Sequence, residues 1–223
     1  MTLTKNTAKL RQEVAAHVAA DSIVQGVYWD AEDQHGCFIG CLAKSNDPAI
    51  NEVTYGLPVM LQRIAESIFE ALPPNEAKAF FSALPGAVAC DGKDLSRVSW
   101  QFLAAELRSL PTQPAEIQAV IDPVIAGMDL LASGQEWPDD AARAAEAAAR
   151  AAAARAAEAA ARAAAAWAAA AWAAEAAAWA AEAAWAARAA AWAAAEAVAH
   201  LRQRDLLLRL IAEAPVVENT NDH

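Results

Sequence analysis

The chain has 223 residues, 57% of them apolar, and a net charge of −11 at pH 7. This negative charge makes duplex nucleic acid and anionic membrane poor partners, because both carry charge of the same sign. Three cysteines are too few for a disulfide scaffold and favour a reducing compartment.

Residues 4–20 predict an amphipathic helix, because apolar residues recur there every four positions. Residues 22–29 are β-branched and aromatic, and a polar turn separates them from residues 37–41, which again resemble a strand. This pattern predicts a small β-hairpin at about residues 22–43.

Helices are expected to dominate from the hairpin to about residue 134. Apolar residues at helical spacing predict several short helices, and Pro123 is expected to kink the last of them. The residues expected to bound these helices are prolines and glycines: Pro73, Pro74, Pro85, Gly86, Pro114 and Gly134.

An alanine-rich tract follows at residues 141–199, of which roughly three quarters are alanine. No glycine or proline interrupts residues 139–214, and alanine has the highest helix propensity of all residues. We therefore expect one long alanine-rich helix, which if unbroken would be roughly 110 Å long. The predicted organisation is a helical globular domain at 1–134, this helix at 135–214 and a frayed tail at 215–223.

Five tryptophans in the tract fall within about half of the helix circumference, and the opposite face is almost bare alanine. A tryptophan row has to be buried, because an exposed one would aggregate. The row packs either on the globular domain or on a second copy, and we favour a homo-oligomer. Tolerated expansion of a repeat is the alternative origin of the tract.

Arg188 is the one cation in the tryptophan-rich segment, between Trp185 and Trp192. An indole can stack on a base while arginine pairs with a phosphate, which makes a small anionic nucleotide-like ligand the predicted occupant. Simple helix packing with a solvated arginine remains the alternative. The candidate ligand-binding residues of the tract are Trp179, Trp185, Arg188 and Trp192.

The hairpin offers a second candidate ligand site at Tyr28, Trp29 and His35, with packed core aromatics as the alternative interpretation. Cys37 and Cys41 lie two and six residues after His35. Together with Cys90 they could hold zinc, or one thiol could be a nucleophile, but small buried cysteines explain the spacing as well. No phosphate loop, dinucleotide fingerprint or Ser-His-Asp pattern is present. We therefore predict no catalytic residue, no metal site and no cofactor.

Several segments together resemble an uncharacterised group of phage and prophage accessory proteins. The resemblance rests on the alanine-rich tract and on four short segments: Gly26 to Trp29, Gly36 to Cys41, Glu66 to Glu70 and Asp94 to Val98. The group supplies no activity to carry over. It implies a small cytosolic phage protein of the kind that modulates the host, in some cases by binding proteins or sequestering nucleotide signals.

The sequence therefore predicts a mainly helical, all-α protein of the cytoplasm. The first 20 residues lack the apolar core of a signal peptide, and the longest uncharged part of the tract, 163–174, is too short to span a membrane. The expected function is non-enzymatic binding by a phage-type accessory protein, with a small nucleotide-like host-defence signal as the sequestered ligand. One alternative is a scaffold that oligomerises through the alanine and tryptophan helix and binds a host protein. The other is an enzyme that depends on cysteine and histidine.

Overall fold

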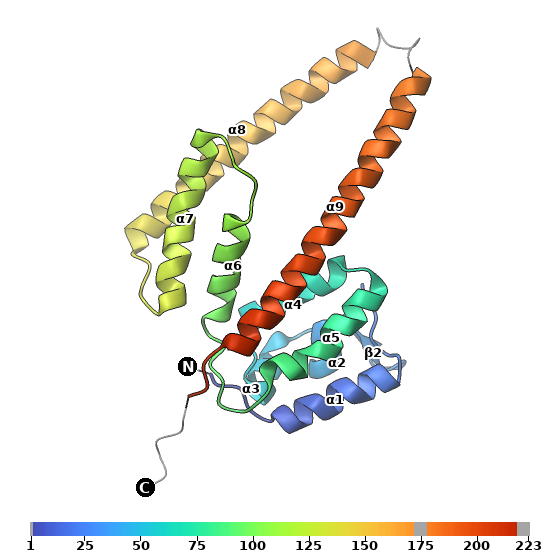
Figure 1. Ribbon diagram of the computed structural model, residues 1–223, viewed down its shortest axis with the longest axis vertical. Helices are drawn as coiled ribbons and strands as arrows, with labels where there is room; N and C mark the ends of the chain where they lie inside the picture. Colours follow the sequence, from blue (N-terminus) through green and yellow to red (C-terminus); the bar gives the residue numbers. More distant parts are fainter. Residues whose placement is uncertain (1, 172–177, 218–223) are drawn as a thin grey trace. The chain divides into compact units, whose positions relative to one another are not determined.

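The computed structural model describes residues 2–171 and 178–217, and within these helices the side chains of residues 156, 159–171 and 178–194 are outside the description. The described part is mainly helical and contains one two-stranded sheet, which confirms the predicted all-α class (Figure 1). The elements in chain order are α1 (Thr7–Ala19), β1 (Trp29–Asp30), β2 (His35–Gly36), α2 (Phe38–Ala43), α3 (Pro48–Tyr55), α4 (Val59–Ala71), α5 (Pro74–Val88), α6 (Val98–Arg108), α7 (Ala115–Ser133), α8 (Asp139–Ala171) and α9 (Ala178–Glu213).

Internal packing divides the chain into two units, and the boundaries fall within α6 and within α9. The first unit contains the residues up to Leu103 together with those from Ala197 onward. The second unit spans Ala104 to Glu196. The end of α9 therefore belongs with the N-terminal helices. The three-part organisation with boundaries at 134 and 214 stays a prediction.

The β-hairpin is smaller than predicted. Its two strands pair antiparallel, with Trp29 opposite Gly36 and Asp30 opposite His35. Asp30 shapes the turn, because its carboxylate accepts hydrogen bonds from the backbone N–H groups of Glu32 and Asp33.

The prediction of a second strand at residues 37–41 was wrong, because this segment enters α2. All six residues of α2 are buried, so its sequence is a short apolar run without a polar face. Periodicity alone does not separate such a run from a strand. Gly40 fits the helix closely against the preceding chain, since a Cβ at this position would lie 1.4 Å from the carbonyl oxygen of Tyr28.

The predicted stop at Pro85 and Gly86 was also wrong, because α5 continues through both residues to Val88. Proline lacks a backbone N–H and so removes one helical hydrogen bond. Pro85 lies in the last turn of α5 and is buried, and the N–H of Ala89 still donates to its carbonyl at 3.0 Å. The predicted limits of α7 at Pro114 and Gly134 are confirmed.

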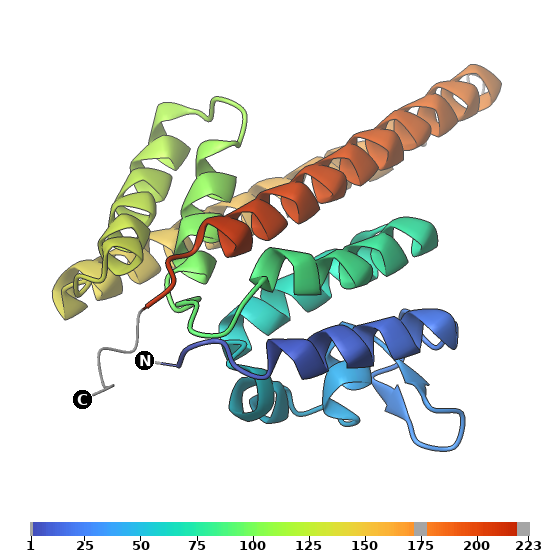
Figure 2. The same cartoon turned by 60° about the horizontal axis from the view of Figure 1, so that its bottom comes forward.

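The core of the first unit is built around an aromatic cluster. Phe38 of α2 stacks on Phe80 of α5 at 5.5 Å between ring centroids, and Phe69 and Phe81 lie close to the same ring. Helices α1 and α5 run side by side along this core, as Figures 1 and 2 both show. The helices around the cluster bury the apolar stripes that the sequence predicted.

The end of α9 packs on this core. Leu207 and Ile211 are 0% and 1% exposed, so the apolar side of this segment is covered by the core of the first unit. The buried ammonium of Lys93 donates to the carbonyls of Ala87, Ile211 and Ala212 at 2.9–3.1 Å. The last carbonyls of a helix lack the full set of helical donors, and a cation there supplies one.

The second unit is packed more sparsely. Helix α7 lies beside α8 (Figure 1), and Ala145 of α8 is buried. Gly127 allows a close approach, because a Cβ there would lie 2.1 Å from the indole of Trp137. The tract predicted to form one long helix is helical before residue 172 and after residue 177, as α8 and α9. Whether the helix is continuous between them concerns residues outside the described part.

Candidate functional site

A small cavity of about 150 Å³ opens in the first unit between the start of α2 and one face of α4. Glu66 and Glu70 lie four residues apart on α4 and therefore share a face of that helix. Cys37 caps the start of α2 and brings its thiol to the same place. The lining residues are Gly26, Val27, Tyr28, Cys37, Glu66 and Glu70.

Both carboxylates are held by backbone N–H groups. Glu66 accepts from the N–H of Ile39 at 3.0 Å, and Glu70 accepts from the N–H of Gly26 at 2.8 Å. Gly26 has a φ of +81°, a conformation that residues with a side chain rarely adopt. The segment before the hairpin is thereby shaped to meet the end of α4.

The Cys37 thiol is fully buried beside Glu66. It donates to the carbonyl oxygen of Tyr28 at 3.6 Å, and burial raises the pKa of the thiol to about 12, with the neighbouring carboxylate contributing. Burial also raises the pKa of the Glu66 carboxyl. A thiol in this state is a poor nucleophile, because the reactive form is the thiolate.

One oxygen or sulfur atom from each of Cys37, Glu66 and Glu70 lies within 4.8 Å of the others. Glu66 is 8% exposed and Glu70 is exposed, so the cluster runs from the interior to the surface. Sequence reasoning missed both glutamates. The available signal was Glu66 itself, because it occupies the buried side of α4 three residues before Phe69.

The zinc ligand set considered from the sequence is not assembled in the described structure. The thiol of Cys41 donates to the carbonyls of Gly36 at 3.2 Å and Ser22 at 3.7 Å, and burial raises its pKa to about 12. Cys90 is exposed at the end of α5. Cys41 is therefore a packed core thiol, as the alternative interpretation of the sequence proposed.

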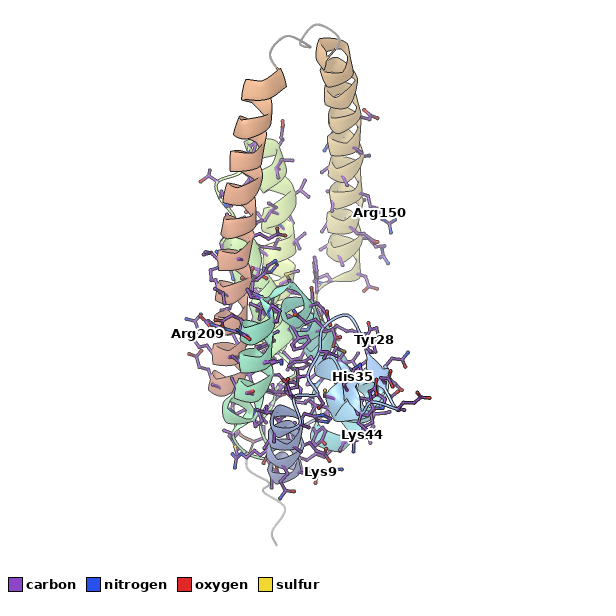
Figure 3. All side chains as sticks on the ribbon, turned by 90° about the vertical axis from the view of Figure 1, so that its right-hand side faces the viewer. Lys9, Tyr28, His35, Lys44, Arg150 and Arg209 are labelled. Atoms are coloured by element: carbon purple, nitrogen blue, oxygen red, sulfur yellow. The ribbon has the colours of Figure 1, made fainter. Side chains whose placement is uncertain are left out.

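The three hairpin residues predicted to bind ligand have different surroundings. Tyr28 lines the cavity, is 47% exposed and bonds through its hydroxyl to Arg63 at 3.3 Å. Trp29 instead stands edge-on to the ring of His17 at 6.0 Å. His35 pairs with Asp30 in the hairpin, on the side of the unit where Figure 3 labels both Tyr28 and His35. Only Tyr28 contributes to the cavity.

His17 is a buried histidine of α1. Its Nδ1 lies 2.7 Å from the hydroxyl of Ser22, and burial lowers the pKa of the imidazole. Burial therefore disfavours the charged form of this ring, which lies on α1 and contacts Trp29 of the hairpin.

The tract residues predicted to bind ligand lie on α9, but their side chains lie outside the described residues. These are Trp179, Trp185, Arg188 and Trp192. The prediction that the tryptophan row forms an oligomer contact also concerns side chains outside the described residues.

A second cavity of about 300 Å³ is lined by Ile23, Val24 and Gln25 together with residues of α4 and α5. Its walls are mainly apolar, and its one cation, Lys78, already pairs with Asp21. The amide of Gln25 is occupied as well, donating to the carbonyls of Phe69 and Leu72. Among the described residues, its lining offers no carboxylate and no thiol, in contrast to the lining of the cavity at Cys37.

Comparison with known proteins gives no relative. No protein family, no curated protein and no solved structure matches this chain. Among the described helices, none has the length and apolar character needed to cross a bilayer. The function must therefore be argued from the cavity.

Proposed function

We propose that the protein acts by holding a ligand without converting it, and that the Cys37 cavity is its binding site. The observation that carries this proposal is the combination of a protonated buried thiol with two fixed carboxylates around one cavity. These groups are arranged to contact a ligand, while the form of Cys37 that performs nucleophilic chemistry is suppressed.

The charge of the cavity favours a cationic ligand. Glu66 and Glu70 both line it, and Arg63, whose charge acts on Glu66, donates to the hydroxyl of Tyr28 and is not among the lining residues. An anion would face two carboxylates at close range, which is unfavourable. A nucleotide-like anion therefore does not suit this cavity. The hypothesis that the protein sequesters such an anion needs a different site, the one predicted around Arg188.

The experiment compares the ligand before and after binding. The untagged full chain is purified from expressing cells, its mass is measured under native conditions, and it is then denatured to release any bound molecule. Our proposal expects a ligand that leaves intact and that is lost in Glu70→Gln. A converted molecule would indicate an enzyme instead, and a bare chain would contradict binding at this site.

The nucleotide hypothesis has its own test at Arg188. Replacement of this residue by glutamate reverses the charge in the tryptophan-rich segment. Retention of an anionic nucleotide should be abolished in Arg188→Glu if the tract binds it, and unchanged in Glu70→Gln. Unchanged retention in Arg188→Glu would exclude the tract as the site.

A scaffold that oligomerises is the second candidate, and α7 favours it. Its apolar stripe is half-buried throughout, and α8 presents mostly alanine beside it. The residues of this stripe are Ile117, Val120, Ile121, Val124, Ile125, Met128 and Leu131. A further apolar surface would complete their burial. Light scattering tests this candidate: a dimer or larger assembly that dissociates in Ile121→Asp supports it, and a monomer at micromolar concentration excludes it.

A further inference from the structure

The strongest unexplained feature of the first unit is the buried carboxylate of Glu66. Glu66 is more than nine-tenths buried and lines the cavity. In the described part of the chain, no lysine or arginine forms an ion pair with it. A buried carboxyl group is paired with a cation, bound to a metal or kept protonated. The hydrogen bond from Ile39 orients Glu66 but brings no positive charge.

The atoms around Glu66 are a metal-ligand set of mixed hardness. One thiol and two carboxylates converge within 4.8 Å, from α4 and from the start of α2. Zinc accepts sulfur and oxygen ligands together, whereas magnesium and calcium prefer oxygen alone. The donor set therefore selects a zinc-like transition metal over the hard cations.

The carboxylates are already oriented by the backbone. The N–H groups of Ile39 and Gly26 each hold one oxygen of Glu66 and Glu70, in the way that outer-shell hydrogen bonds orient metal ligands. Glu66 also forms a side-chain hydrogen bond with the Cys37 thiol, and a metal would take the place of the thiol proton between these two groups. Glu70 is exposed, so the cluster also has an entry path from solvent.

We propose that Cys37, Glu66 and Glu70 bind one divalent transition metal ion of the zinc class. This inference rests on the proposed binding function and names its ligand. The metal takes the Cys37 sulfur as thiolate, and the thiol proton passes to solvent as the metal–sulfur bond forms. Three protein ligands leave a fourth position that opens onto the cavity.

The test uses the untagged full chain carrying Cys90→Ser, which removes the exposed thiol as a competing ligand. Metal is stripped with a chelator, and the chain is then titrated with Co²⁺ as a spectroscopic substitute for zinc. We expect one equivalent to produce a sulfur-to-cobalt charge-transfer band and tetrahedral visible bands, and one equivalent of Zn²⁺ to bleach them.

Variants assign the ligands. Cys37→Ser should abolish the charge-transfer band, and Glu70→Gln, at an exposed position, should weaken Co²⁺ binding more than about 10-fold while circular dichroism stays unchanged. The matched control is Cys41→Ser, which removes a second buried thiol outside the cluster and should leave the band intact. If Cys37→Ser does not fold, Glu66→Gln and Glu70→Gln provide the same test.

Two outcomes overturn the inference. The first is a chain that gives no band and binds no Zn²⁺, and the second is a band that survives both glutamate variants. The proposed binding function would still hold in either case if native mass measurement found an organic cation lost in Glu70→Gln. If that measurement finds no bound molecule and the chain also binds no metal, both the metal site and the proposed binding function are contradicted.

Discussion

The two units of this protein are stabilised in different ways. The first buries large side chains completely: Phe80, Phe81 and Leu207 are at most 1% exposed. In α7 of the second unit, by contrast, the apolar stripe is half-buried, and the fully buried residue of that helix is Gly127. Tight packing can fix a cluster such as Cys37, Glu66 and Glu70, whereas the alanine residues of α8 favour the helix through their high propensity.

The surface of α8 carries weak, exposed ion pairs instead of buried contacts. Arg150 pairs with Glu146 at 2.5 Å, and Arg143 lies 4.0 Å from Asp139, each pair four residues apart and exposed. Such pairs contribute only about 0.3–0.5 kcal/mol each. We therefore expect substitutions in the first unit to have much larger effects than those in the second.

The largest difference is expected for buried against half-buried apolar residues. Phe80→Ala removes a ring stacked on Phe38 and should lower the free energy of unfolding by about 3–5 kcal/mol. The matched change Ile125→Ala in α7 should cost less than about 2 kcal/mol, because that side chain is half-exposed. Urea denaturation measures both. Equal costs would contradict the contrast between the units.

A second test uses two helical glycines of the first unit. Gly40→Ala places a methyl group against the Tyr28 carbonyl and should destabilise the fold by about 3 kcal/mol, as overpacking does. Gly86→Ala meets open space on α5 and should be neutral or stabilising by up to about 1 kcal/mol. Thermal denaturation separates them. A tolerated Gly40→Ala would show that α2 does not approach Tyr28 this closely.

The anchoring of α9 can be weakened at one buried cation. Lys93→Met leaves the carbonyls of Ala87, Ile211 and Ala212 without this donor and should cost about 2 kcal/mol. The control is Lys78→Met, which breaks an exposed ion pair with Asp21 and should cost less than about 1 kcal/mol. Equal midpoints of urea unfolding for the two variants would refute the role assigned to Lys93.

The smallest effect is a pH dependence from His17. Burial lowers its pKa in the folded state, so below the ordinary histidine pKa of about 6.5 the unfolded chain binds more protons than the folded one. Stability from this residue is therefore complete above that pH and declines as the pH falls through it. Glu13 and Lys44 both face the ring and act in opposite directions. His17→Gln should flatten the urea midpoint between about pH 7.5 and 5.5, and an unchanged slope would assign the dependence to other groups.

Much of the fold follows from the sequence, because helical periodicity reports burial directly. Leu207 and Ile211 are four positions apart, as on one face of a helix, and both side chains are buried. The error at residues 37–41 has a physical cause. A fully buried helix of six residues has no polar side, so its pattern matches a buried strand.

The candidate site was only partly predictable. Tyr28 and Cys37 are nine residues apart in the chain and line the same cavity, and both were candidate residues from the sequence. Glu66 and Glu70 come from α4, and only tertiary packing brings them to Cys37. A glutamate at a buried position of an amphipathic helix is a pattern that could have indicated Glu66, whereas Glu70 is exposed and gives no such signal.

The central claim is that the cavity at Cys37 holds a ligand through its carboxylates and does not transform it. The most direct measurement is the native mass of the untagged full chain, isolated without chelators, beside that of Glu70→Gln. We predict an added mass on the unaltered chain that denaturation releases unchanged and that is absent from the variant. A bare mass for the unaltered chain, or an equal added mass on both proteins, would contradict the claim.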